Sequence, residues 1–402
     1  MPAKAAHAVA PTERLLALDV FRGATIAAML VVNNPGTWSA VYPPLLHAEW
    51  HGWTPTDLIF PFFLFIVGVT THLSLSARRA RGDADRALAR QVLRRGGLIF
   101  LWGLVLSGFP FFWTGAMPDH LDPTFLDRIV YRFEHFRFLG VLQRIGIAYV
   151  CAALLTFRTS LKQQVAIVAA LLFGYWFAMT LLPIPGHGLG MFQLDSRSDN
   201  LAAHLDRWIL DVDHIWSGSR TFDPEGPLST IPAIGTAILG VFTGRWLGSG
   251  RSLPERIAGL FGAGFLATVA GLAWHWSFPI NKSLWTSSYV LFTGGAGAMS
   301  LAACLWIIDA LRVPWWTTPF KVFGVNPLVA FVGSGLMARL IYSLIRVEWG
   351  GGTVSVQAAI YEALFASWLE PRDASLLFAL CFTGFWLLVL WALYKRNIII
   401  RV

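Results

Sequence analysis

The sequence has few charged residues and few cysteines. Asp, Glu, Lys and Arg together make up 13% of the 402 residues, and the chain has 3 cysteines. Soluble globular domains carry about a quarter charged residues, so this composition argues against a soluble enzyme. All three cysteines lie inside apolar runs, which makes them poor candidates for a disulfide framework or a metal site.

Several common catalytic patterns are also missing. The sequence shows no His and Cys spacing of the zinc-binding kind, no glycine-rich phosphate loop and no G-x-S-x-G nucleophile turn. We therefore expect no metal cofactor. Any chemistry must come from polar side chains scattered among apolar segments.

The main feature of the sequence is its long apolar runs. Hydrophobic residues account for 55% of the chain, and its mean hydropathy is +0.57. Apolar runs of about 18 or more residues recur along the sequence, and each is long enough to cross a hydrocarbon core of about 30 Å. The pattern predicts an all-α, polytopic transmembrane helical bundle with about ten spans, at 15–33, 55–77, 96–114, 138–157, 163–183, 228–248, 256–277, 285–309, 322–345 and 374–394.

Basic residues gather in the segments that this topology places on one side, including seven arginines from Arg78 to Arg95. The positive-inside rule then predicts that both termini are cytoplasmic. The net charge of +8 comes mostly from these basic residues on the cytoplasmic side, so we expect no nucleic-acid partner. Residues 1–13 read as a disordered cytoplasmic tail without a signal-peptide cleavage pattern, and 14–402 as one transmembrane domain. Its long outer loop, 184–227, is expected to cover or line an outer cavity.

A polar segment runs directly into the second span, as LLHAEWHGWTPTDLIFPFFLFIVG at 45–68. Titratable side chains at the mouth of a span are costly, so they indicate a functional site. His47 is a candidate general base or nucleophile, the alternative being an interfacial histidine that binds water. Asp57 follows Thr54 and Pro55 in a pattern typical of helix capping, and its carboxylate is also placed to orient an imidazole.

Two arginines lie within predicted spans. Arg22 is three residues from Asp19, so the two share a helix face and can pair. Arg144 has no acid within four residues. It needs either a carboxylate from another helix or an anionic ligand, such as a phosphate group.

Polar residues also mark several predicted helix ends. Asn33 ends the first span, and Asn281 and Lys282 precede the eighth; such side chains either cap helices or bind polar ligand groups. The run TGGAGAMS at 293–300 is typical of close helix packing through small residues.

These motifs, in one consistent order from Arg14 to the C-terminus, resemble the heparan-α-glucosaminide N-acetyltransferase family and its bacterial relatives. The motifs that carry the resemblance are RLLALDVFRG, VVNNPG, HAEWHGWTPTDLIFPFFLFIVG, FRFLGVLQRIG, FDPEG with the following LSTIPAIGTAILG, INKSLWTSSYV and TPFKVFGVNPLVAFVG. One departure is that the family's W-N-G reads Trp50-His51-Gly52 here. His51 itself reads as a packing or interfacial residue.

The resemblance implies a transmembrane acyltransferase that moves an acetyl group from cytoplasmic acetyl-CoA to the amine of a terminal glucosamine-type sugar on the outer side. It gives His47 the catalytic position, with Asp57 and Asn33 beside it. Whether His47 acts as a general base or forms an acetyl-histidine stays open at this stage. The residues expected to contact the acetyl-CoA donor are Arg137, Arg144, Arg22, Asn281 and Lys282.

Two other functions stay open. The chain is also consistent with an inner-membrane N-acetylglucosamine permease in which His47 couples proton movement, although no inverted repeat is visible. An acyltransferase that acts on an envelope lipid or polysaccharide differs only in its acceptor. We expect a multi-pass protein of the bacterial inner membrane that contacts the lipid bilayer, and the resemblance leaves room for a homodimer.

Overall fold

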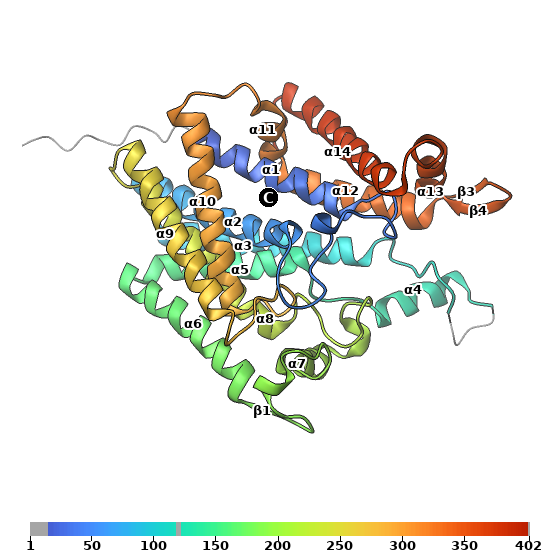
Figure 1. Cartoon of the computed structure of the whole chain (residues 1–402), viewed down its shortest axis with the longest axis horizontal. Coiled ribbons are helices and arrows are strands. Elements are labelled where there is room, and N and C mark those ends of the chain that lie inside the picture. Colours follow the sequence, from blue (N-terminus) through green and yellow to red (C-terminus); the bar gives the residue numbers. More distant parts are fainter. Residues whose placement is uncertain (1–14, 118–121, 401–402) are drawn as a thin grey trace, which may run out of the picture.

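The computed structural model describes residues 15–117 and 122–400, and the predicted tail at 1–13 lies outside this range. The described chain is almost entirely helical (Figure 1). Its long helices are α1 (Leu16–Asn33), α2 (Ile59–Ala80), α3 (Asp85–Gly108), α5 (Val141–Arg158), α6 (Leu161–Leu181), α8 (Pro227–Leu247), α9 (Leu253–Trp274), α10 (Ser287–Cys304), α12 (Pro327–Arg339) and α14 (Pro371–Lys395). The shorter ones are α4 (Phe125–Glu134), α7 (Leu201–Leu210), α11 (Thr318–Val325) and α13 (Val356–Tyr361).

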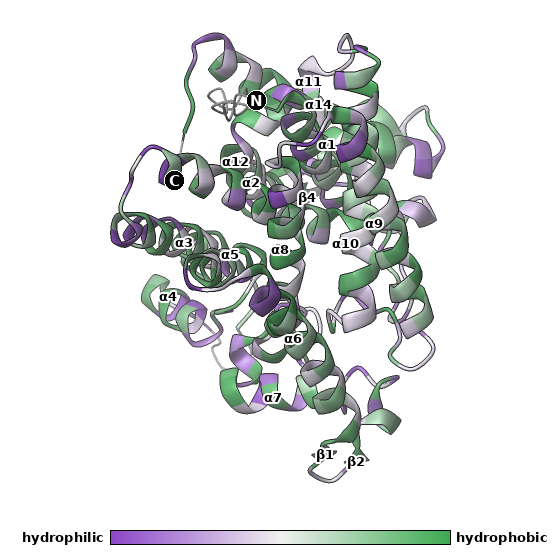
Figure 2. Ribbon diagram, turned by 90° about the vertical axis from the view of Figure 1, so that its left-hand side faces the viewer, coloured by the Kyte–Doolittle hydropathy of each residue, from purple (hydrophilic) through white to green (hydrophobic). Residues whose placement is uncertain are grey.

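Strands form only two small hairpins among the described residues. β1 (Pro183–Ile184) pairs antiparallel with β2 (Gly188–Leu189), and β3 (Arg346–Trp349) pairs antiparallel with β4 (Gly352–Ser355). The all-α class predicted from the composition is therefore confirmed. Figure 2 shows that the long helices are mostly hydrophobic, whereas hydrophilic residues gather in α7 and on one side of α4.

Nine helices of the described chain are long and apolar enough to cross a membrane. The one predicted span that is not among these nine, 96–114, falls in α3, whose arginine-rich first half lowers the hydropathy of the helix. Its second half runs antiparallel along α5, because Gly96 lies against Gly146 and Gly103 against Gln143. The predicted bounds of this span were wrong at both ends, since α3 begins at Asp85, so that Arg86, Arg90, Arg94 and Arg95 belong to the same helix, and it ends at Gly108.

The predicted span at 322–345 is also interrupted. α11 ends before Asn326, and Pro327 starts α12, as expected for a residue that lacks an N–H and suits the first helical turn. The Asn326 side chain donates to the Ile398 carbonyl over 3.0 Å. The helices α10, α12 and α13 continue as short π-helical segments, at Leu305–Ala310, Leu340–Leu344 and Glu362–Ala366.

Glycines let neighbouring helices approach closely. A Cβ on Gly68 of α2 would lie 1.9 Å from the Ala237 carbonyl oxygen of α8, and one on Gly295 of α10 would lie 2.4 Å from the Gly264 oxygen of α9. α9 and α10 accordingly lie side by side in Figure 1. The small-residue packing predicted for 293–300 is confirmed.

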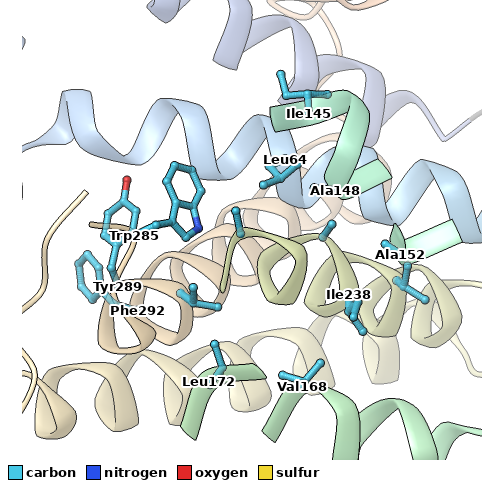
Figure 3. Packing of buried hydrophobic residues seen from close by; sticks show 14 of the residues in the cluster. Leu64, Ile145, Ala148, Ala152, Val168, Leu172, Ile238, Trp285, Tyr289 and Phe292 are labelled. Atoms are coloured by element: carbon cyan, nitrogen blue, oxygen red, sulfur yellow. The ribbon is translucent and has the colours of Figure 1, made fainter. Parts of the chain in front are cut away.

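The central core joins α2, α5, α6, α8 and α10. Leu64, Ile145, Leu172 and Ile238 of four of these helices belong to one buried cluster with Tyr289 of α10 (Figure 3). The Tyr289 hydroxyl donates to the backbone carbonyl of Asp57. This bond links the core to the start of α2, so the core fixes the position of the polar segment before that helix.

Candidate active site

The α2 helix starts on a 3₁₀ turn, Pro55–Leu58, that holds a buried carboxylate. Asp57 is 1% exposed. Its Oδ2 accepts the Thr54 N–H and the Ala48 N–H, each over 3.0 Å, while the single hydrogen of the Thr54 hydroxyl goes to the Leu46 carbonyl over 2.6 Å. The bond from the Thr54 N–H confirms the predicted capping arrangement, and Oδ1 is left for another partner.

That second oxygen lies against His47. The distance from Asp57 Oδ1 to His47 Nδ1 is 2.7 Å. Because an ionised carboxylate only accepts hydrogen bonds, Nδ1 carries the hydrogen and Nε2 keeps its lone pair. The His47 side chain is 51% exposed, so a substrate can reach it. The arrangement suits a general base or nucleophile oriented by a carboxylate.

Lys282 completes this group from a distant part of the sequence. Its Nζ lies 3.0 Å from both ring nitrogens of His47 and 3.7 Å from Asp57 Oδ1. Burial lowers the pKa of the Lys282 ammonium, and the neighbouring Asp57 and Glu225 carboxylates act in the opposite direction. A cation in this place can stabilise negative charge that develops on an oxygen near His47.

The segment that carries Lys282 is held by its own side chains. Asn281 Oδ1 accepts the Leu284 N–H over 2.9 Å, and the Asn281 N–H donates to the Thr286 hydroxyl over 3.0 Å. Trp285 has a φ of 51°, in the left-handed region, which turns the chain into α10. Asn281 is therefore a structural residue of this turn, and no described contact places its amide beside His47.

Asn281 instead contacts His51. Its Nδ2 is 3.2 Å from His51 Nδ1, and His51 Nε2 is 3.0 Å from Asp195 Oδ1 in the long loop. Burial lowers the pKa of His51, and Asp195 partly offsets this effect. The two contacts agree with the prediction that His51 is a packing residue. The long loop also holds this segment through a 2.9 Å bond from Trp50 Nε1 to the Leu194 carbonyl.

Arg137 forms an ion pair that its sequence neighbours did not indicate. Its guanidinium donates to both carboxylate oxygens of Asp223, over 2.8 Å and 2.6 Å, and also contacts Glu225. Burial opposes the charge of Arg137, but Glu225 and Asp223 raise its pKa above the usual range. Although burial also opposes the charge of Glu225, its pKa lies below the usual range because Arg137 and Arg144 are close.

Asp223 and Glu225 received no predicted role, even though both lie in the quoted FDPEG motif. Two acids at the end of a long loop, directly before a proline-started helix, were the available signal. Asp206 of α7 was also missed. It is buried, accepts the Asp223 N–H over 2.9 Å, and has a pKa raised by burial to about 7.

Arg144 is 1% exposed. Its Nη2 lies 2.5 Å from the Ser229 hydroxyl and its Nε 3.3 Å from the Thr230 hydroxyl, and the guanidinium lies 5.0 Å above the Trp285 ring. Its Nη1 has no hydrogen-bond partner among the described residues. Glu225 is near enough to act on its charge. The structure therefore gives Arg144 protein partners, and its predicted contact with the donor stays a prediction.

No described hydrogen bond or ion pair joins the remaining predicted residues to His47. Arg22 pairs with Asp19 over 3.1 Å, as their shared helix face predicted. Arg22 also donates to the Gly324 carbonyl over 3.1 Å. It is about 16 Å along α1 from Asn33, at 1.5 Å per residue. Asn33 ends α1 and lines a cavity of about 290 Å³, together with Arg137.

The structure thus brings together His47, Asp57 and Lys282, and joins them electrostatically to Arg137 and Glu225. It holds Arg22 in a separate ion pair. Across 15–117 and 122–400, no group of three or more His, Cys, Asp or Glu side chains is placed to hold a metal ion. The cluster places an imidazole beside a carboxylate and a cation, an arrangement that can support general-base chemistry and stabilise developing negative charge.

A family model and the curated relatives of this chain carry the same family name. The sequence model of the family described as heparan-alpha-glucosaminide N-acetyltransferase, catalytic, matches residues 14–263. This segment includes His47, Asp57 and Arg137 but ends before Lys282. The heparan-alpha-glucosaminide N-acetyltransferase of Mus musculus is 26% identical over 438 residues, covering 97% of this chain and 60% of the relative.

The protein of the same name from Homo sapiens is 28% identical over 367 residues, covering 80% of this chain and 52% of the relative. The chain therefore spans between about half and three fifths of the length of these curated relatives.

Proposed function

Because the chain belongs to the heparan-alpha-glucosaminide N-acetyltransferase family, we propose that it is a membrane-embedded acetyltransferase acting on the amine of a glucosamine-type sugar. The donor we propose is acetyl-CoA, supplied from the cytoplasm. The family match and the names of the relatives support acetyl transfer. The observation that carries the proposal is the 2.7 Å contact of His47 with a buried, capping Asp57, beside the Lys282 ammonium.

In the proposed reaction the amine nitrogen of the sugar attacks the thioester carbonyl carbon. A nitrogen–carbon bond forms, the carbonyl oxygen becomes an oxyanion, and His47 Nε2 takes the proton that the nitrogen loses. Without substrate the Lys282 ammonium faces the Nε2 lone pair at 3.0 Å, so in this reaction it turns to the oxyanion, which frees Nε2 to act as the base and stabilises the negative charge. The carbon–sulfur bond then breaks, and the proton passes from His47 to the departing CoA thiolate. Asp57 positions His47 throughout and touches neither substrate.

The acetyl-histidine route differs in one step. There His47 Nε2 attacks the thioester carbon itself, and the sugar amine later displaces the imidazole. We favour the direct route because an amine is a strong nucleophile once it is deprotonated, and a thioester carbon is already electrophilic. Rapid-quench trapping of labelled acetyl groups on the protein in the absence of a sugar would overturn this preference.

We further propose that the His47 end of the bundle faces the outer side of a bacterial inner membrane. The arginine-rich segment at the start of α3 lies at the opposite end, since α2 runs from the His47 end towards it. The positive-inside rule places such a segment in the cytoplasm. The donor then reaches the site through the helices from the cytoplasmic face. The bacterial assignment rests on the motif resemblance to bacterial members.

The test is acetyl transfer by the purified protein. Labelled acetyl-CoA and glucosamine-terminated acceptors should give labelled N-acetyl product, and His47→Ala should lower the rate by roughly two to four orders of magnitude. His187→Ala, an exposed histidine of the long loop, is the matched control and should leave the rate unchanged. Uptake of N-acetylglucosamine into vesicles without any transfer would overturn the proposal in favour of a permease.

A further inference from the structure

His51 and Gly52 hold the turn that carries Lys282. The Gly52 N–H donates to the Ile280 carbonyl over 2.8 Å, and the His51 ring meets the Asn281 amide over 3.2 Å. Gly52 has a φ of 94°, in the left-handed region that favours glycine. Two consecutive residues are thus bonded to the two residues directly before Lys282, so these bonds bear on where its ammonium lies.

The direction of the bond between His51 and Asn281 is fixed by the surrounding protein. Asn281 is buried, and its Oδ1 accepts the Leu284 N–H over 2.9 Å. A flipped amide would point its NH₂ group at that N–H, so the NH₂ group must face His51. His51 Nδ1 therefore accepts, and the ring hydrogen lies on Nε2, which donates to Asp195 Oδ1 over 3.0 Å.

Only a neutral imidazole can make both of these bonds. Protonation of His51 puts a hydrogen on Nδ1, where it would face the hydrogens of the Asn281 amide, so the bond between them is lost. Among the described residues, Asp195 of the long loop and His275, which follows α9, are the titratable groups that act on His51. Burial favours the neutral ring and lowers the pKa of His51, whereas Asp195 favours the charged ring.

The Lys282 ammonium depends on this turn for its position. Its contacts among the described residues are with His47, at 3.0 Å, and with Asp57, at 3.7 Å. In the proposed reaction the ammonium leaves the His47 lone pair for the oxyanion, so its position then depends on the backbone that carries it. That backbone is held by the bonds to His51 and Gly52.

We propose that His51 is a positioning residue, whose neutral ring holds the turn that places Lys282 beside His47. The inference rests on the function proposed above, because that function gives Lys282 its part in acetyl transfer. Protonation of His51 in acid releases Asn281, and the ammonium then no longer lies where the oxyanion forms. Acetyl transfer therefore falls in acid for two reasons, since protonation of His47 also removes its lone pair.

Two substitutions separate the two bonds of His51. In His51→Asn, Oδ1 takes the position of Nδ1 and keeps the bond to Asn281, whereas the contact with Asp195 is lost. In His51→Gln, the longer side chain reaches Asp195 and leaves the Asn281 amide without its acceptor. We expect kcat close to the native value for His51→Asn. For His51→Gln we expect kcat to be about tenfold lower at unchanged KM, the scale of one lost hydrogen bond.

Three comparisons separate this role from a merely structural one. His187→Asn and His187→Gln, at an exposed histidine of the long loop, are the matched controls and should leave kcat unchanged. The acid side of the kcat profile should be less steep for His51→Asn than for the native protein, because asparagine does not titrate. In a Lys282→Met background, His51→Gln should change kcat little, since its effect passes through Lys282.

A further measurement needs no activity. In protein labelled with nitrogen-15 at histidine, the ring signals of His47 are those lost in His47→Ala. These signals should move in His51→Gln in the direction seen for Lys282→Met, and they should stay in place in His51→Asn. If the native protein transfers no acetyl group, the proposed function fails, and these signals alone decide whether His51 positions Lys282.

Equal loss of kcat in His51→Asn and His51→Gln would overturn the proposal, because the bond to Asn281 would then be irrelevant. Equal effects of His51→Gln with and without Lys282 would also overturn it, as would His47 signals that stay in place in His51→Gln. Melting temperatures show whether the variants are folded. If His51→Gln is unfolded, the pH profile of His51→Asn decides, and a profile as steep as the native one would contradict the role of His51.

Discussion

Replacing Asp57 by Asn is the sharpest perturbation of the site. Two backbone N–H groups point at Oδ2, those of Ala48 and Thr54. The carbonyl oxygen of the new amide must take that position, because an NH₂ group there would face both of these hydrogens. The amide NH₂ is then forced towards His47 Nδ1.

This orientation reverses the tautomer of His47. Nδ1 becomes an acceptor, so the hydrogen moves to Nε2 and the base towards the substrate is lost. Removal of a correctly oriented base costs roughly 10³- to 10⁴-fold in rate, or about 4 to 5.5 kcal/mol of barrier at 1.36 kcal/mol per factor of ten. Since the cap is kept, the melting temperature should change little.

The assay is kcat for acetyl transfer from acetyl-CoA to a glucosamine acceptor, measured with the melting temperature. Asp57→Ala is the informative companion, because it loses the cap as well and should lower stability by about 0.5–2 kcal/mol in addition to the rate. If Asp57→Asn keeps kcat within about fivefold of the native value, His47 is not oriented by Asp57 and our reasoning about the base is refuted.

Three further changes test the neighbouring charges. Lys282→Met should lower kcat by about 10²-fold with little effect on KM, as expected for an oxyanion contact, and a change in KM alone would contradict that role. Arg144→Gln should lower the melting temperature by several degrees with or without CoA, because it removes the charge beside Glu225; weaker CoA binding at an unchanged melting temperature would instead place a donor phosphate there. The pKa of Asp206 is raised by burial to about 7, so its contribution to stability is full below about pH 4, falls as the pH rises towards 7 and then levels off. Asp206→Asn should therefore lack this decline, which melting curves between pH 5 and pH 8 will show, and parallel curves for the two proteins would refute it.

Local patterns predicted the capping role of Asp57 and its contact with His47. His47, Thr54 and Asp57 lie within one short segment. The sequence alone therefore places the histidine near the capping carboxylate. Asp19 and Arg22 pair on one helix face for the same reason. The cap of Thr54 and Asp57 and the pair of Asp19 and Arg22 depend on helix geometry, which spacing determines, whereas His47 reaches Asp57 from the loop before the helix.

Contacts between distant segments could not be predicted in this way. Arg137 meets Asp223 and Glu225 across more than 80 residues, and Lys282 reaches His47 from the α9–α10 connection. Only the folded bundle decides which loop acid meets which cation. The arginine-rich half of α3 was misassigned for a related reason, because hydropathy detects the part of a helix inside a membrane and not the helix itself.

Sealed vesicles with the protein in one known orientation test the central claim most directly. Acetyl-CoA is supplied only on the face that carries the arginine-rich start of α3, and a membrane-impermeant glucosamine acceptor only on the His47 face. We predict acetylated acceptor for the native protein and none above background for His47→Ala. Product only when both substrates share one face, or equal product from the two proteins, would contradict a transmembrane acetyltransferase that works through His47.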